Sequence, residues 1–99
     1  MNKILDSEII EKEIKKILQK NSDITYGMKS SNTTLSIYLR LYLGDCKHTL
    51  RISDHLTKKT DVKTLLIQKN TKLKTVINFI NSGIKTLRLV HFQKVLKNL

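Results

Sequence analysis

The three residue types of a hydrolase triad stand side by side at Ser53, Asp54 and His55. In such a triad the serine attacks, the histidine takes its proton, and the carboxylate orients the histidine. Three neighbours on an extended chain point in alternating directions, so this run does not predict that geometry. We interpret Ser53 as the end of a strand, Asp54 as a turn residue and His55 as the start of a loop. Asp54 and His55 are candidates for contact with a partner, and a hydrolase centred on His55 is a third functional hypothesis.

The chain has one cysteine and three histidines, and both residue types are common metal ligands. They are Cys46, His48, His55 and His91. Cys46 and His48 would share one face of a strand, but no CxxC or HxxxH spacing is present. The sequence also lacks a P-loop, a GxGxxG run and a paired-carboxylate motif. We therefore expect no metal site, no cofactor and no enzymatic activity.

Aromatic and basic residues gather on one face of two neighbouring predicted strands. They are Tyr38, Arg40, Tyr42, Lys47 and Arg51. Bases can stack on tyrosine rings while arginine and lysine meet phosphate, so this face predicts nucleic-acid binding. The alternative is ordinary cross-strand pairing of tyrosine with lysine or arginine on a solvated face.

A second group of basic residues lies towards the end of the chain. Lys72 and Lys74 fall at the start of a predicted helix, where lysine side chains and the helix N-terminus can meet phosphate together. The alternative is a solvated helix face. Lys58 and Lys59 in a polar loop, and Arg88 further on, are additional candidates for contact with a partner.

Length and charge point to a single small domain, residues 1–99, with a polyanionic partner. The formal net charge is +11 over 99 residues. Residues 1–23 carry no net charge, whereas the segment from Val62 to the end has basic residues and no acid. We expect the partner to be a nucleic acid or a host nucleoprotein. The single cysteine, the presence of acids among the first residues and the lack of a long apolar run predict a cytoplasmic protein without membrane contact.

The clearest structural pattern is a hairpin. Leucine or isoleucine occupies every second position of Leu35–Leu43, which is the period of a half-buried strand. Gly44 and Asp45 then suit a two-residue turn before a return strand over 46–53. In that register Leu39 faces Leu50, Tyr38 meets Arg51, and His48 lies on the apolar face.

The remaining elements are helical at both ends. Residues 7–20 predict an amphipathic helix capped by Asp6 or Ser7, and residues 21–34 are turn-rich with a short strand near Ile24–Met28 as an option. Thr64–Gln68 predicts a third strand. Thr71 would cap a helix over 72–82 that ends at Gly83, and 84–97 continue in helical pattern.

These elements predict an α+β fold. It has an N-terminal helix, an antiparallel three-stranded sheet, and one long or two short C-terminal helices packed on one face. We expect the exposed sheet edges to allow a homodimer.

Two resemblances bear on function. The order helix, three strands, helix resembles the double-stranded-RNA-binding domain, which implies phosphate contacts from Lys72 and Lys74 at the start of the final helix. The run Arg51–His55, "RISDH", resembles a run in small uncharacterised proteins of phages and other mobile elements. That resemblance implies an accessory protein that binds nucleic acid or blocks a host defence complex.

The leading hypothesis is therefore a small, basic, non-enzymatic nucleic-acid-binding protein that holds the phosphate backbone with its sheet face and C-terminal helices. The alternative is a phage-type inhibitor, similar to an anti-CRISPR protein, that binds a host defence or replication complex.

Overall fold

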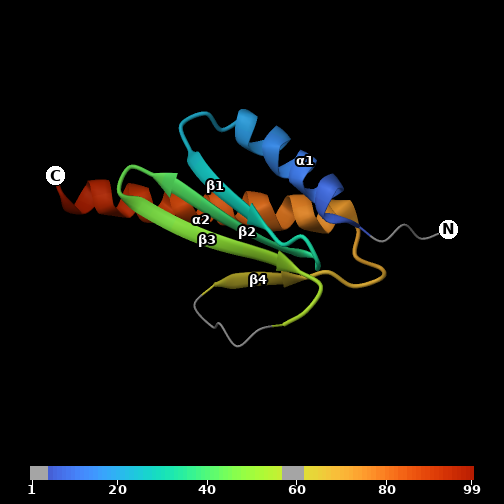
Figure 1. The fold of residues 1–99 in the computed structure, drawn as a ribbon. Coiled ribbons are helices and arrows are strands. Elements are labelled where there is room, and N and C mark those ends of the chain that lie inside the picture. Colours follow the sequence, from blue (N-terminus) through green and yellow to red (C-terminus); the bar gives the residue numbers. More distant parts are fainter. Residues whose placement is uncertain (1–4, 57–61) are drawn as a thin grey trace.

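The computed structural model describes residues 5–56 and 62–99, which form one α+β unit. Its elements are α1 (Ser7–Gln19), β1 (Thr25–Ser30), β2 (Ser36–Leu43), β3 (Cys46–Ser53), β4 (Lys63–Leu66) and α2 (Leu73–Lys97). The strands form one sheet in the order β1-β2-β3-β4, and both helices lie on the same side of it (Figure 1). The predicted α+β class, with helices on one face of a sheet, is confirmed.

The sheet differs from the predicted three antiparallel strands in two respects. The optional strand near 24–28 is a full edge strand, β1, antiparallel to β2. The last strand, β4, pairs with β3 in parallel, with Lys63 beside Leu50. The hydrophobic period of a strand does not reveal whether it pairs in parallel or antiparallel, so the sequence pattern could not predict this direction.

The hairpin register is confirmed residue by residue. Leu39 faces Leu50 and Tyr38 faces Arg51, as the alternation requires. Gly44 has a φ of 58°, so the first turn position uses the left-handed conformation that glycine adopts without strain. Because side chains alternate across the pleat, this register sends every second residue to the helices and the others to the opposite side. We call the two sides the inner and outer faces of the sheet.

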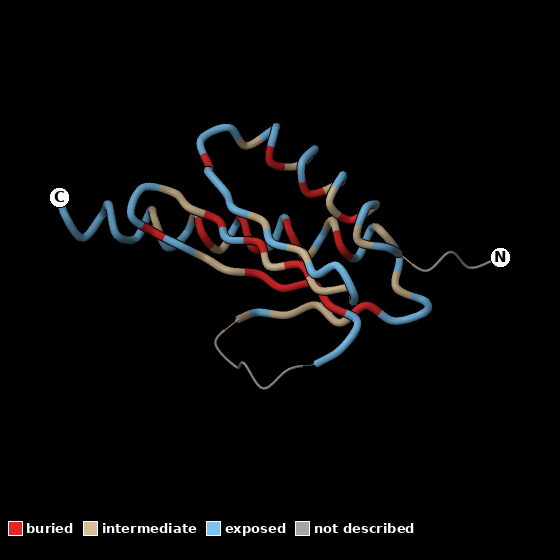
Figure 2. The backbone as a smooth tube through the Cα atoms, viewed as in Figure 1, coloured by how far each residue is buried: buried red, intermediate tan, exposed pale blue. Residues whose placement is uncertain are grey.

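The core fills the space between the inner face and the helices. Ile10, Ile14 and Leu18 of α1 are buried at helical spacing, and Asp6 caps that helix by accepting a 2.9 Å hydrogen bond from the Ile9 amide. The other buried apolar side chains are Ile24, Ile37, Leu39, Leu41, Cys46, Leu50, Ile52, Ile67, Val76, Ile80, Ile84 and Leu87. In Figure 2 the buried segments of sheet and helices face one another.

The C-terminal segment is one continuous helix, which settles the alternative between one and two helices. Gly83 lies inside α2 and is buried, so the predicted C-terminal cap at that residue is wrong. A Cβ at Gly83 would stand 2.5 Å from Leu50 Cδ1, which means that the glycine lets α2 approach the sheet closely. Thr71 does not cap the helix either, because the N-cap is Lys72 and Thr71 Oγ1 accepts a hydrogen bond from the Gln68 amide.

We expect Gly83→Ala to lower the free energy of unfolding by about 1–2 kcal/mol, since overpacking against Leu50 exceeds the gain of about 1 kcal/mol in helix propensity. Leu50 is fully buried, so its side chain can move aside only by displacing other core side chains. Urea denaturation measures the change. Gly27→Ala is the control, because a Cβ there meets nothing within 4 Å. A G83A variant as stable as G27A would contradict the close-approach account.

Candidate nucleic-acid interface

The outer face consists of three cross-strand rows over β1, β2 and β3. From β1 to β3 they are Lys29–Tyr38–Arg51, Gly27–Arg40–Thr49 and Thr25–Tyr42–Lys47. Tyr38 thus stands between two basic residues, and Tyr42 has Lys47 beside it. The structure brings together the five predicted residues of this face, and it adds Lys29, which the sequence analysis did not select.

Three cations of the outer face are available to a ligand. Lys29, Arg40 and Lys47 are exposed, and among residues 5–56 and 62–99 no carboxylate forms an ion pair with them. Tyr38 and Arg40 also line a hollow of about 260 Å³ with Lys29, Ser30, Ser31 and Ser36. A neighbouring hollow of about 200 Å³ reaches Gly27 and Tyr42, where the missing glycine side chain leaves open space.

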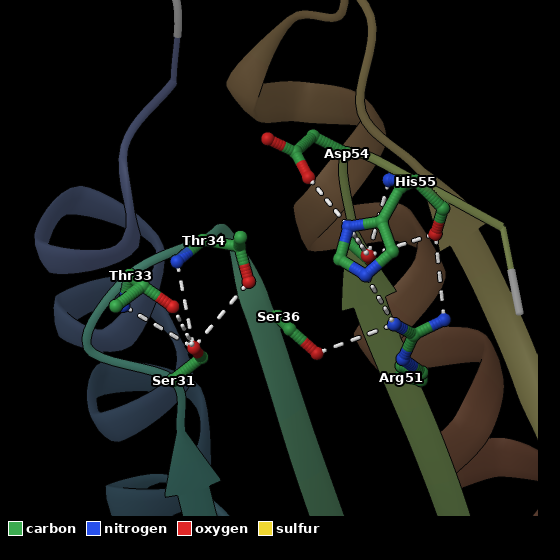
Figure 3. A network of polar contacts seen from close by, with 8 residues as sticks. Ser31, Thr33, Thr34, Ser36, Arg51, Asp54 and His55 are labelled. Atoms are coloured by element: carbon green, nitrogen blue, oxygen red, sulfur yellow. Dashed lines mark hydrogen bonds and ion pairs between the residues drawn. The ribbon is translucent and has the colours of Figure 1, made fainter.

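Arg51 lies on the outer face but is buried, with 2% of its surface exposed. Its guanidinium donates to Ser36 Oγ at 3.3 Å and to the His55 carbonyl at 3.4 Å, and lies 3.3 Å from His55 Nε2 (Figure 3). It also stands 5.4 Å from the centre of the Tyr38 ring, within cation–π range. The predicted phosphate contact from Arg51 does not fit this burial. The side chain instead holds the β3 exit and the Tyr38 ring in place.

The Ser53-Asp54-His55 run forms a compact turn. Ser53 Oγ donates to the His55 carbonyl at 2.9 Å and accepts from the His55 amide at 3.2 Å. Contrary to the expectation from alternating directions, the side chains do meet: His55 Nδ1 lies 2.8 Å from Asp54 Oδ1 and 3.2 Å from Ser53 Oγ. Both partners share one ring nitrogen, whereas a triad places them on opposite nitrogens, and Ser53 is fully buried. The predicted strand end and turn are confirmed, and Asp54 and His55 are exposed.

The other predicted contact residues do not join the outer face. Lys72 and Lys74 are exposed at the start of α2, which belongs to the helical layer on the other side of the sheet. Arg88 binds Asp23 through both terminal nitrogens and donates to Asn21 Oδ1 at 2.9 Å, so it links α2 to the segment before β1. The hydrogen bonds from Arg88 to Asp23 lower the pKa of the Asp23 carboxyl. Lys58 and Lys59 lie outside the described residues.

His48 lies on the inner face, opposite Leu41, as predicted. Its Nε2 atom is buried and has no hydrogen-bond partner among the described residues. Burial lowers the pKa of His48, and the charge of Lys63 adds to this effect. In the part of the chain that the structure describes, no three His, Cys, Asp or Glu side chains gather in a group that could hold a metal ion.

A larger hollow lies elsewhere and has the wrong charge for a polyanion. It is an open depression of about 940 Å³ lined by the carboxylates of Asp6, Glu8, Glu11 and Asp54, and Lys69 is the one cation among its described lining residues. A phosphate group there would meet like charge. The outer face is therefore the better candidate, although its hollows are smaller.

Lys29 and Gly27 are the residues that the sequence analysis missed. The signal was present in "TYGMKS", where Thr25, Gly27 and Lys29 alternate with Tyr26 and Met28. A glycine in a short segment with few apolar residues weakens a strand pattern. Only the pairing of β1 with β2 places Lys29 next to Tyr38.

The fold and the outer face define a two-layer α+β protein with element order α-β-β-β-β-α and one open, basic sheet face. Comparison with protein-family models, curated proteins and solved structures finds no significant match. The order contains one strand more than the helix, three strands, helix order of the double-stranded-RNA-binding domain. Within the described residues, no helix is long and apolar enough to cross a membrane.

We expect Arg51→Lys to lower the free energy of unfolding by about 1–3 kcal/mol, because lysine cannot replace the branched hydrogen bonds of a buried guanidinium. Urea denaturation followed by circular dichroism measures it. Lys47→Gln is the control on the same strand and face, and its exposure predicts a change within about 0.5 kcal/mol. Equal stability of the two variants would show that the Arg51 contacts contribute nothing.

The lowered pKa of His48 predicts a stability that depends on pH. As pH falls below the ordinary histidine pKa, the unfolded chain binds a proton at this site before the folded chain does, so stability decreases. We expect His48→Leu to reduce the loss of stability between about pH 7 and pH 5.5. Thr49→Val, one residue further along β3 and without a titrating group, should keep the wild-type slope. Parallel slopes for H48L and wild type would refute the assignment.

Proposed function

We propose that this protein binds nucleic acid through the outer face of its sheet, without enzymatic activity and largely without reading sequence. The observation that carries the proposal is an open sheet face on which three exposed cations without ion-pair partners among the described residues surround two tyrosines. These residues are Lys29, Arg40, Lys47, Tyr38 and Tyr42. The net charge of +11 supports a polyanionic ligand.

The spacing of the strand supports a stacking platform for a single strand. Tyr38 and Tyr42 are four residues apart on β2, which places them about 13 Å apart along the strand, with Arg40 midway. Bases that stack on the two rings would bring the intervening phosphate towards Arg40. Arg51 contacts the Tyr38 ring through a cation–π interaction. In this proposal Arg51 positions the ring and does not itself contact phosphate.

The helical layer is not part of this interface. Lys72 and Lys74 lie across the sheet from the outer face, so one ligand segment cannot contact both groups over the same stretch. The N-terminus of α2 lacks a side-chain cap, but nothing else there indicates a ligand. We therefore assign the binding to the sheet face and give the helix lysines a general electrostatic role.

The experiment compares two triple variants with equal loss of charge. K29Q/R40Q/K47Q removes three outer-face cations, and K69Q/K72Q/K74Q removes three exposed lysines near the start of α2. Fluorescence anisotropy with single- and double-stranded DNA and RNA is measured across a salt series. We expect the first variant to bind single strands at least tenfold more weakly and to lower the salt slope by about 2, whereas the second changes affinity less than about threefold.

Equal losses from the two variants would mean that binding follows net charge alone, which contradicts a specific face. Unchanged affinity of K29Q/R40Q/K47Q would refute the proposal directly. Thermal unfolding of both variants ensures that a loss of binding is not a loss of fold.

The second candidate is an inhibitor that binds a host defence or replication complex, as the "RISDH" run suggested. In that run Arg51, Ile52 and Ser53 are buried, so a partner would meet only Asp54 and His55. Absence of binding to any naked nucleic acid at low salt would favour this candidate, because the charge would then serve a protein or nucleoprotein partner.

A further inference from the structure

The segment of α2 after Leu87 exposes an apolar surface. Leu87 is the last buried residue of the helix. His91 and Lys94 still lie beside Gly44 and Asp45 of the β2–β3 turn, and the end of the helix projects past that turn (Figures 1 and 2). Six large apolar side chains are exposed in this segment: Leu89, Val90, Phe92, Val95, Leu96 and Leu99. Scattered exposed apolar residues are normal, but a continuous group on one helix indicates a contact surface.

Four of these residues have the spacing of a coiled-coil seam. Leu89, Phe92, Leu96 and Leu99 are separated by three, four and three positions, as the a and d positions of a heptad are. We call these four residues the C-terminal seam. At 100° per residue the three helical members, Leu89, Phe92 and Leu96, lie roughly 170° around the helix from the core-facing side that holds Leu87. Leu99 follows the C-cap Asn98 directly after the end of α2. The inner face of the sheet therefore cannot cover the seam.

The flanks of the seam carry no free charge. The adjoining e and g positions hold Gln93 and Val95, and Arg88 at the preceding g position is paired with Asp23. Lys94 and Lys97 fall on the far side of the helix, where Lys94 binds Asp45 at 3.0 Å. A partner helix with the same sequence would thus meet apolar side chains and one amide, without like charges opposite one another.

We propose that the C-terminal seam pairs with the same seam of a second copy of this chain, with the two helices antiparallel. In that arrangement Leu89 meets Leu99 of the other copy and Phe92 meets Leu96, so the seam is complementary to itself about a two-fold axis. The inference is independent of the nucleic-acid proposal, since no outer-face residue takes part.

Lys85 decides the orientation. It occupies the d position before Leu89 and is exposed. A parallel pair would place two Lys85 ammonium groups opposite one another in the seam. An antiparallel pair places each Lys85 beyond the C-terminal end of the other helix, so the two ammonium groups lie far apart.

The pairing should be weak and should strengthen with salt. The seam covers about one and a half heptads, which is short for a coiled coil, so we expect a dissociation constant of roughly 10–100 µM. Each copy carries +11, and salt screens the repulsion between the copies. Binding of nucleic acid weakens with salt, so the two associations respond in opposite directions.

Sedimentation equilibrium of Leu96→Lys and Val90→Lys tests the seam. Both residues are about half exposed on the same stretch of helix, but Val90 lies off the seam. We expect L96K to weaken dimerisation at least tenfold and V90K to change it less than about threefold. A wild-type chain that stays monomeric up to about 1 mM in high salt would overturn the proposal, as would equal effects of the two variants.

Disulfide pairing tests the orientation. The chains C46A/L89C and C46A/L99C are mixed and oxidised, with native Cys46 replaced so that the introduced thiols are the only ones. Antiparallel pairing yields mainly the mixed disulfide, because two copies of position 89 would be about 15 Å apart along the axis, too far to bridge. Predominant L89C–L89C disulfides would overturn the antiparallel arrangement.

Discussion

The register of the β2–β3 hairpin is the constraint on which the rest of the structure depends. Because side chains alternate across a strand, one register decides at once which residues form the core and which form the outer face. A shift by one residue would turn the apolar residues of one of the two strands out to solvent and bring that strand's polar residues against α2. The contact between Gly83 and Leu50 fits the same register. This register directs the Leu50 side chain inward, and the glycine lets α2 pack closely against it.

Local patterns were sufficient for the elements whose partners are near in sequence. The hairpin, its turn at Gly44 and the first helix were predictable because alternation, helical spacing and capping are local signals. Gly83 was misinterpreted because a glycine that ends a helix and one that admits a neighbour look alike in sequence. The parallel pairing of β4 and the burial of Arg51 depend on contacts between strands and with the β3 exit, and no local pattern encodes those contacts.

The helical layer and the outer face of the sheet differ in whether their basic side chains form ion pairs. In the helical layer, Arg88 and Lys94 are paired with Asp23 and Asp45, and the hydrogen bonds they donate lower the pKa of both carboxyl groups. These pairs join α2 to segments on either side of the first two strands, so their acids serve the assembly of the fold. Asp23 and Asp45 are thereby paired away from the outer face, and no described carboxylate forms an ion pair with Lys29, Arg40 or Lys47 there. Sequence charge alone predicted a basic surface but could not say which layer would retain it.

The order of the elements also bears on how the chain folds during synthesis. The hairpin is complete at Ser53, but Val76, Ile80 and Leu87, which cover its inner face, come later in the chain. Until Leu87 has left the ribosome, the leucines and isoleucines of the hairpin lack most of their cover. A nascent chain at that stage would present a half-finished apolar sheet to chaperones or to neighbouring chains. The tendency of the nascent chain to aggregate should therefore fall once α2 has emerged and covers the inner face of the hairpin.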